Sequence, residues 1–260
     1  MNSVNKTMYI PLYGKAYVSE KGLFLKDETA QKIWAQEGFL LRGKAKSKRL
    51  AYFMGIRSAV FDEWLRECLC EMPDAAVIHL GCGLDSRVLR VGTNNHCWYD
   101  VDFPEVITER RKFFTENERY KMISADVRSG DWLNKITDTD SAIVVMEGVS
   151  MYLTAEEREA LAENLSARFQ KISLLADFYT VLAAKISKYR NPVNEVGVSA
   201  VYGTDDPQIF EKDGLRFVKE PEMTPQKYID ELQGIEKKIF EKLYAGSFSK
   251  RLYRLYEYRK

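Results

Sequence analysis

Residues 78–87 read IHLGCGLDSR, and residues 99–104 read YDVDFP. An apolar run over residues 75–80 leads into a Gly-x-Gly turn, and the next apolar run ends at the acids Asp100 and Asp102. Glycines in such a turn let the backbone approach a ligand closely. An acid at the end of the following strand can accept hydrogen bonds from a ribose diol. The two segments therefore predict a binding site for a nucleotide-like cofactor.

The spacing within this pattern bears on the kind of cofactor. Gly83 and Asp102 are separated by roughly the 20 positions of the dinucleotide fingerprint. That fingerprint requires a third glycine where this chain has Ser86. We therefore disfavour NAD, and with it a dehydrogenase, and favour another adenosine cofactor.

The acidic residues of these segments have different expected roles. Asp102 ends a strand-like run and is favoured as a ribose ligand over a role as a helix N-cap. Asp100 shares its face by the two-residue period of a strand, so it is a second candidate cofactor residue, and a structural role is the equal alternative. Asp85 either contacts the cofactor or orders the glycine turn.

Apolar runs and helical patterns alternate along the middle of the chain, which predicts a parallel sheet covered by helices on both faces. The strand-like runs are 75–80, 96–101, 120–125, 141–147 and 172–178, and helices are expected over 104–117 and from a capping box at Thr154 to residue 169. Residues 1–72 are predicted to be a helical region, with helices over 29–39 and 50–70, that contributes to the cofactor and acceptor sites. Residues 73–260 form the predicted core, with an unpatterned insert at about 181–203, a short helix from Asp206-Pro207, a strand over 215–219, a helix over 228–244 and a closing strand over 252–258.

The composition excludes several classes of protein. Lys and Arg number 39 and Asp and Glu 38, so the net charge of +1 gives no field for nucleic acid. No apolar run approaches the ~18 residues of a membrane span, and the N-terminus lacks a signal-like stretch, so we expect a cytoplasmic protein. The four cysteines do not have metal-site spacing and are expected to be free thiols.

Seven segments together resemble one family. They are YGKA at 13–16, FLKD at 24–27, RSAVFD at 57–62, GCGLDSR at 81–87, VDFPEV at 101–106, SADVRSGDW at 124–132 and MEGVSMYL at 146–153. In this order and spacing they resemble the leucine carboxyl methyltransferase superfamily, including its tetracenomycin-type polyketide O-methyltransferases. The resemblance implies a class I, Rossmann-like fold with seven strands, S-adenosylmethionine as methyl donor, and a carboxyl or hydroxyl acceptor.

The resemblance also implies roles for individual residues. Gly81 and Gly83 would let the backbone reach the cofactor, Asp102 would hold its ribose, and Asp126 with the backbone of Val127 would bind its adenine. Glu147 would lie near the methionyl end, with an ammonium as partner. Lys15 and Arg57 match the basic residues for the cofactor carboxylate, for which an arginine fork is well suited. Trp132 is interpreted as a core residue rather than an adenine contact.

An activated sulfonium donor needs an aligned acceptor more than a nucleophilic side chain. A carboxylate acceptor needs no base, whereas for a phenol the nearest candidate bases are Glu147 and Tyr152. We therefore predict metal-free transfer to oxygen, with a carboxylate of a small molecule favoured. The alternatives are a non-catalytic protein that binds adenosyl ligands and a protein C-terminal carboxyl methyltransferase. The oligomeric state stays open.

Two further segments have less certain roles. The basic run at 42–49 is interpreted as a solvated loop rather than an attractor of an anionic acceptor. The tail is interpreted as a strand with mixed faces, and as the alternative Tyr253, Tyr256 and Tyr258 are candidate contacts to an aromatic substrate. The acceptor pocket is expected between the N-terminal helices and the 181–203 insert.

Overall fold

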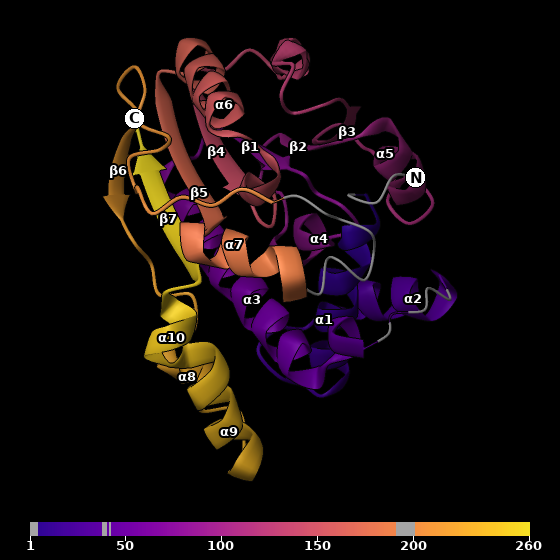
Figure 1. Ribbon diagram of the computed structural model, residues 1–260. Coiled ribbons are helices and arrows are strands. Elements are labelled where there is room, and N and C mark those ends of the chain that lie inside the picture. The colour runs from indigo at the N-terminus through magenta and orange to yellow at the C-terminus, as the bar shows by residue number, and fades with distance from the viewer. Residues whose placement is uncertain (1–4, 38–40, 42, 191–200) are drawn as a thin grey trace.

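A computed structural model of the chain describes residues 5–37, 41, 43–190 and 201–260. Its centre is a seven-stranded sheet with the order β3-β2-β1-β4-β5-β7-β6 (Figure 1). Strands β1 to β5 are parallel, and β7 runs antiparallel to both β5 and β6. The predicted seven-stranded, mostly parallel sheet is therefore confirmed. The strands are β1 (Ala76–Leu80), β2 (Trp98–Asp102), β3 (Tyr120–Ser124), β4 (Ser141–Met146), β5 (Lys171–Tyr179), β6 (Arg216–Lys219) and β7 (Tyr253–Arg259).

Helices cover both faces of the sheet, which explains why the central strands β1 and β4 are mostly apolar. Alternate residues of each strand enter one of two separate cores. Val77, Val145 and Leu175 pack with the N-terminal helices, whereas Ile78 and Val144 pack with the helix that follows β4. Figure 1 shows the N-terminal helices below the sheet and α6 above it, with α8, α9 and α10 extending as an arm at the lower left.

The helical segments divide the chain as follows. The α-helices are α1 (Tyr9–Glu20), α2 (Glu28–Glu37), α3 (Lys48–Glu71), α4 (Arg87–Val91), α5 (Pro104–Arg110), α6 (Ala155–Arg168), α7 (Val181–Arg190), α8 (Gln226–Ile229), α9 (Gly234–Phe240) and α10 (Ser247–Lys250). Shorter 3-10 segments are η1 (Asn5–Met8), η2 (Gly43–Lys46), η3 (Asp131–Lys135) and η4 (Ser150–Tyr152), and η6 (Glu241–Ala245) is a π-helical turn.

The start of α6 shows the predicted capping box. The Glu157 N–H donates to the Thr154 Oγ1 at 3.2 Å, and the Thr154 N–H donates back to Glu157 Oε2 at 2.8 Å. These two bonds satisfy backbone donors that the first helical turn leaves without partners. A purely local pattern of four residues thus fixes where this helix begins.

Three predicted helical segments and the insert differ from the structure. The helix expected over 104–117 ends at Arg110 and passes into a turn at 111–113. The helix expected over 228–244 is divided into α8, α9 and η6, with Gly234 at a φ of +57° at the start of α9. Residues 207–210 after Asp206 form a turn instead of a helix. The insert begins with a regular helix, α7. Residues 38 and 39 of the expected helix over 29–39 and residues 191–200 of the insert lie outside the described residues.

Candidate functional site

A cavity of about 540 Å³ opens at the carboxyl ends of β1, β2 and β4. The strand order changes direction between β1 and β4, and such a switch point leaves a crevice in open α/β sheets. Gly81, Asp102 and Glu147 lie at the ends of these three strands and line the cavity. The parallel register of the sheet therefore brings together segments that are far apart in sequence.

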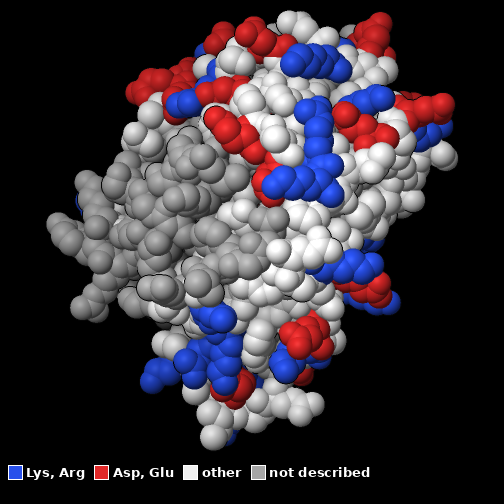
Figure 2. Space-filling view, turned by 90° about the vertical axis from the view of Figure 1, so that its right-hand side faces the viewer, with Lys and Arg blue, Asp and Glu red and all other residues white. Residues whose placement is uncertain are grey.

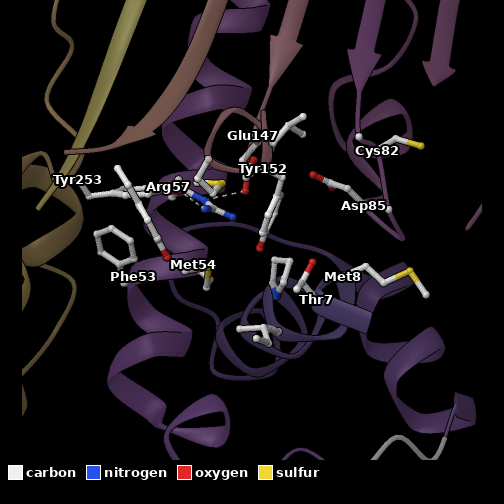
Figure 3. A pocket seen from close by; sticks show the side chains of 18 of the residues that line it. Thr7, Met8, Phe53, Met54, Arg57, Cys82, Asp85, Glu147, Tyr152 and Tyr253 are labelled. Atoms are coloured by element: carbon white, nitrogen blue, oxygen red, sulfur yellow. Dashed lines mark hydrogen bonds and ion pairs between the residues drawn. The ribbon is translucent and has the colours of Figure 1, made fainter. Parts of the chain in front are cut away.

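Of the cofactor residues and candidate bases predicted from the sequence, all but one line this cavity. The lining includes Lys15, Arg57, Gly81, Gly83, Asp85, Asp102, Asp126, Val127, Glu147 and Tyr152. The exception is Asp100. Figure 3 shows Cys82 and Asp85 at one end of the cavity, Phe53 and Tyr253 at the other, and Tyr152 between them.

The turn between β1 and α4 requires glycine at positions 81 and 83. Gly81 has a φ of +63° and Gly83 a φ of +52°, the left-handed region that favours glycine. A Cβ at Gly81 would lie 2.2 Å from Val149 Cγ2, and one at Gly83 would lie 3.2 Å from Met8 Cβ. The turn therefore passes close to the segments that enclose the cavity.

Asp102 is tied to this turn. Its Oδ2 accepts the Gly83 N–H and its Oδ1 accepts the Phe103 N–H, both at 2.8 Å. Burial nevertheless raises the pKa of Asp102 to about 6, because these backbone donors offset only part of the cost of desolvating its charge. A buried carboxylate with remaining lone pairs that faces a cavity can accept further hydrogen bonds from a polar ligand.

Asp100 has a structural role, which corrects the interpretation that it shares the ligand site with Asp102. It pairs with Arg110 from α5 and accepts hydrogen bonds from the Tyr120 hydroxyl at 2.6 Å and from Trp98 Nε1 at 2.9 Å. Burial would raise the pKa of Asp100, but Arg110 and the other donors hold it at about 2. The side chain is occupied in joining β2 to β3 and α5, so it does not reach the cavity.

Glu147 is held between two arginines. Its Oε1 accepts Arg57 Nε at 3.0 Å, while its Oε2 pairs with Arg87 Nη2 and accepts the Ser58 hydroxyl at 3.3 Å. Burial alone would raise the pKa of Glu147, but Arg87 and Arg57 hold it at about 2. A carboxylate with so low a pKa is a weak proton acceptor. The geometry therefore does not favour Glu147 as a general base.

The N-terminal helices are joined to the glycine turn by buried ion pairs. Lys15 Nζ lies 3.1 Å from Asp85 Oδ2, and Arg90 Nη1 lies 2.7 Å from the other oxygen of Asp85. Arg87, which is fully buried, pairs with Asp62 at 2.7 Å. Lys15 thus already has a carboxylate partner, and its charge also contributes to the field at the cavity wall.

Arg57 makes a second set of contacts with the far side of the site. Its Nη1 donates to Asp177 Oδ2 at 3.1 Å and to the Tyr253 hydroxyl at 2.7 Å. Figure 3 shows its guanidinium pointing from α3 toward the space between Glu147 and Tyr152. Arg57 therefore presents positive charge to the cavity, and its hydrogen bonds to Glu147, Asp177 and Tyr253 fix its position.

The segment after β3 contributes a more exposed wall. Asp126 pairs with Arg128. The Arg128 Nε lies 2.8 Å from Asp126 Oδ1 and 2.9 Å from Asp126 Oδ2. Both residues and Val127 line the cavity. Trp132 is completely buried, donates from Nε1 to the Val127 carbonyl at 3.2 Å and packs in the core, as expected from the sequence.

Tyr152 lies in the cavity but is unsuited to accept a proton. Burial raises its pKa above the usual 10.0 of a tyrosine, so its hydroxyl is protonated at neutral pH. With Glu147 held at low pKa, neither of the bases considered from the sequence is favoured by the geometry. Tyr152 instead offers a hydroxyl at the middle of the cavity (Figure 3).

The tail tyrosines separate according to the faces of β7. Tyr253 lines the cavity and packs on Phe53 and Tyr179, with ring centroids 5.7 Å and 5.1 Å away. Tyr256 and Tyr258 project to the opposite face and pack in the core around α6, so the tail is the expected strand with mixed faces and these two candidates are not available to a substrate. The two-residue period of the strand makes these positions mutually exclusive.

The basic run at 42–49 does not line the cavity where it is described. Lys48 and Arg49 both approach Glu236, at 2.6 Å and 3.9 Å, so this end of the run joins α3 to the arm. Arg42 lies outside the described residues. Figure 2 shows acidic and basic side chains interspersed over the described part of the face that it presents.

Several site residues were missed by sequence reasoning. Phe53 and Met54 of α3, and Tyr179 at the end of β5, carry ordinary core-like patterns that give no signal. Asp177 had a signal, since it is an acid within the apolar run of β5 and therefore needs a buried partner. Arg87 stood in the quoted GCGLDSR segment, but nothing local indicated its partners.

Comparison with known proteins identifies the family. The leucine carboxyl methyltransferase family profile matches residues 12–166, more than half of the chain. The chain belongs to this family. Tetracenomycin polyketide synthesis O-methyltransferase TcmP of Streptomyces glaucescens is 28% identical over 244 residues, covering 91% of this chain and 89% of that protein. An S-adenosyl-L-methionine-dependent methyltransferase, dpfgK of Gibberella zeae, is 26% identical over 183 residues, covering 65% of this chain and 61% of that protein.

A solved structure supports the fold. The Synechocystis magnesium protoporphyrin IX methyltransferase, determined with bound SAH, superposes with a TM-score of 0.52 at 13% sequence identity, covering 95% of this chain and 97% of that one. The predicted family, the class I methyltransferase fold and an S-adenosylmethionine-dependent methyltransferase as the class of enzyme are therefore confirmed. Among the residues that the structure describes, no helix is long and apolar enough to cross a membrane, and no cluster of metal-ligating side chains occurs.

Proposed function

We propose that the protein transfers the methyl group of S-adenosylmethionine to an oxygen atom of a small molecule. The observation that carries this proposal is a single cavity with room for both cofactor and acceptor. It has the glycine turn and carboxylates at one end and aromatic side chains at the other. The name of the Streptomyces relative, a polyketide O-methyltransferase, supports both oxygen as the methyl acceptor and a small molecule as substrate.

In this proposal, the residues around the glycine turn each bind a different part of the cofactor. Asp102 accepts the ribose hydroxyls, and Asp126 with the backbone of Val127 faces the adenine. Arg57 faces the cofactor carboxylate, because a guanidinium can pair with both oxygens of that group. Glu147 fixes the position of Arg57 and contributes the negative charge that faces the ammonium.

The chemistry asked of the protein is modest. The bound sulfonium supplies an already activated methyl group. The side chains of the aromatic end exclude water and hold the acceptor oxygen in line with that methyl, which is the main contribution that alignment can make to the rate.

Ligand titration tests the cofactor part of this proposal. Calorimetry should show binding of S-adenosylmethionine and of its demethylated product, SAH, with no heat from NADH. Incubation of a metabolite pool with enzyme and isotopically labelled methyl donor should then yield a labelled O-methyl product by mass spectrometry. Affinity for the adenosyl ligands without any labelled product would favour a non-catalytic binding protein instead.

The ribose role of Asp102 predicts a large loss of affinity on truncation. Asp102→Ala should weaken SAH binding by roughly 1.5–3 kcal/mol, the range for hydrogen bonds to a charged group. Calorimetric titration measures this, and Asp138→Ala, which changes a fully exposed aspartate, serves as control. Unchanged affinity in the Asp102 variant would rule out the ribose role.

The pH dependence of binding follows from the same residue. Because the pKa of Asp102 is raised from 3.8 to about 6, lowering the pH through that value protonates a carboxylate that the ribose needs as acceptor. The dissociation constant for SAH should therefore rise as the pH falls from about 7 to about 5, by up to tenfold per pH unit. Asp102→Asn should bind weakly with no inflection in this range.

Stability should change with pH in the opposite direction. A group whose pKa is raised on folding stabilises the fold below its unfolded value, and that contribution is lost as the pH rises through the folded value. Asp102 therefore favours the unliganded fold below about pH 4 and loses that contribution as the pH passes about 6. Parallel changes of SAH affinity and unliganded stability across this range would contradict the assignment.

We also propose that the reaction takes place in the cytoplasm. Cys68, Cys70, Cys82 and Cys97 are free thiols in the structure, and Cys70 is exposed. Free thiols of this kind fit a reducing compartment. Cell fractionation with an antibody to the protein tests the proposal, and recovery in an extracytoplasmic fraction would contradict it.

A further inference from the structure

A second cavity lies behind the aromatic end of the main one. It has a volume of about 330 Å³ and is enclosed by the segment at 220–224, the start of β7, α10 and one residue of α3. Among the described residues, four line both cavities: Phe53, Tyr244, Ser249 and Tyr253. The two spaces are therefore neighbours, and these four residues, here called the dividing wall, stand between them.

The dividing wall consists mainly of three packed aromatic rings. The ring of Phe53 contacts both of the others, with its centroid 5.7 Å from that of Tyr244 and 5.7 Å from that of Tyr253. Figure 3 shows Phe53 beside Tyr253 at the β7 end of the main cavity. Ser249 of α10 adds only a small side chain. The rings therefore close the passage between the cavities, and removal of one ring would join the two spaces.

Tyr244 is the ring that the arm of α8, α9 and α10 adds to the dividing wall. It is carried by η6 and stacks on Phe240, four residues earlier, with centroids 5.3 Å apart and planes inclined by 8°. Phe240 is completely buried in the core formed with the N-terminal helices. Tyr244 is thus packed between a buried ring and Phe53, an arrangement that aromatic pairs favour. The ring acts as a fixed stop at this end of the main cavity.

The space behind the dividing wall suits an uncharged group. Glu220 pairs with Arg254 at 2.9 Å. Glu222 pairs with Lys250 at the same distance. These four charges balance one another, and Met223 adds an apolar contact. Because the volume of this cavity falls within the roughly 300–1,000 Å³ of ligand sites, an acceptor could extend into it if the rings were absent. The dividing wall, and not a lack of space behind it, sets the limit.

We propose that Tyr244 and Phe53 set the maximum length of the methyl acceptor by closing the main cavity toward the second one. The proposal rests on the function proposed above and specifies its substrate class as a compact acceptor whose unreactive end abuts these two rings. It applies equally to a carboxylate and to a hydroxyl acceptor, because the rings contact the end that does not react. Both residues therefore determine specificity and take no part in the transfer itself.

Probes that differ by one ring test this limit. The short probes are 2-naphthol and 2-naphthoate. The long probes are 6-phenyl-2-naphthol and 6-phenyl-2-naphthoate, which carry a phenyl ring at the end opposite to the oxygen. A buried extra ring ordinarily raises affinity, because it removes apolar surface from water. When the probes are titrated by fluorescence into the SAH complex of the wild type, each long probe should instead bind no more tightly than its short counterpart.

Removal of a ring from the dividing wall should reverse this order. Tyr244→Ala creates a space of the size of the added phenyl ring, so the long probe should bind at least about tenfold more tightly than it binds the wild type, with the short probe changed by less than about threefold. Phe53→Ala opens the wall from α3 and should give the same gain. Tyr244→Phe keeps the ring and should keep the limit. Tyr228→Ala is the matched control, because it removes a half-buried ring of the same arm that lines neither cavity.

Product analysis gives a readout that a merely loosened arm would not change. With labelled methyl donor and an equal mixture of a short and a long probe, the wild type should label mainly the short one. Tyr244→Ala should shift the label toward the long probe. A purely structural effect of this substitution would lower both products together and leave their ratio unchanged.

The outcomes separate this inference from the proposed function. A long probe that binds the wild type more tightly than its short counterpart, or that gains nothing from either ring deletion, would overturn the assignment of the dividing wall. An equal gain in Tyr228→Ala, or no binding of any probe to the SAH complex, would overturn it as well. SAH binding would in these cases leave the proposed function standing. Failure of the wild type to bind SAH or S-adenosylmethionine would instead overturn the proposed function itself.

Discussion

Arg87→Met is expected to lower the free energy of unfolding by about 3 kcal/mol or more. Breaking a buried ion pair by removing one partner typically costs about 3–5 kcal/mol, because the other charge stays buried without compensation. Arg87 is fully buried and pairs with Asp62 and Glu147. Each of these carboxylates keeps another arginine, Arg90 or Arg57, so we place the loss at the lower end of the range. Denaturant unfolding with a shared slope for wild type and variant measures it.

A surface ion pair provides the control for this prediction. Lys250→Met removes the partner of Glu222 at 2.9 Å, and both side chains are at least half exposed. Exposed pairs contribute at most about 1 kcal/mol, so this variant should remain close to wild type. Equal destabilisation of the two variants would contradict a special role for the buried network around Arg87.

Glu147→Gln should damage both the fold and cofactor binding. The amide has the shape of the carboxylate but cannot balance Arg57 and Arg87, which contact its two oxygens. We expect a loss of about 3 kcal/mol in unfolding free energy, together with weaker SAH binding because Arg57 loses the contact that positions it. The resemblance alone implies an effect on cofactor binding, because it places Glu147 near the methionyl end, and the two buried arginines add the effect on stability. Denaturant unfolding and calorimetry on the same sample separate these effects.

The low pKa of Glu147 means that its contribution to stability does not depend on pH near neutrality. A carboxyl whose pKa is lowered on folding contributes stability above its unfolded value, and that contribution is lost as the pH falls through its folded value. With a shift from 4.5 to about 2, the contribution of Glu147 is constant at neutral pH and disappears only in acid. Glu159→Gln, at an exposed partner of Lys212, is the matched control and should change neither quantity. Wild-type stability in Glu147→Gln at pH 7 would show that the carboxylate charge is not needed by its arginines.

The sequence by itself determined the features that depend on short segments. Continuous apolar runs identified the strands β1, β4 and β5, because strands covered on both faces have no polar side to alternate with. The capping box at Thr154 placed the start of α6 through two bonds made within four residues. The glycine turn and the acid at the end of β2 placed the cavity, since parallel strands direct their carboxyl ends to the same edge.

Only the tertiary structure decided which side chains are available at that edge. Asp100 and Asp102 share a face of β2, but Asp100 is bound by Arg110 and Tyr120. No short-range sequence pattern predicts that pairing. Tyr253 and Tyr256 lie close together in one strand, yet only the first faces the cavity. Arg57 and Asp177 are 120 positions apart and meet in a buried ion pair. Such pairs depend on the packing of whole helices against the sheet, because a buried charge is stable only where the fold brings it a partner.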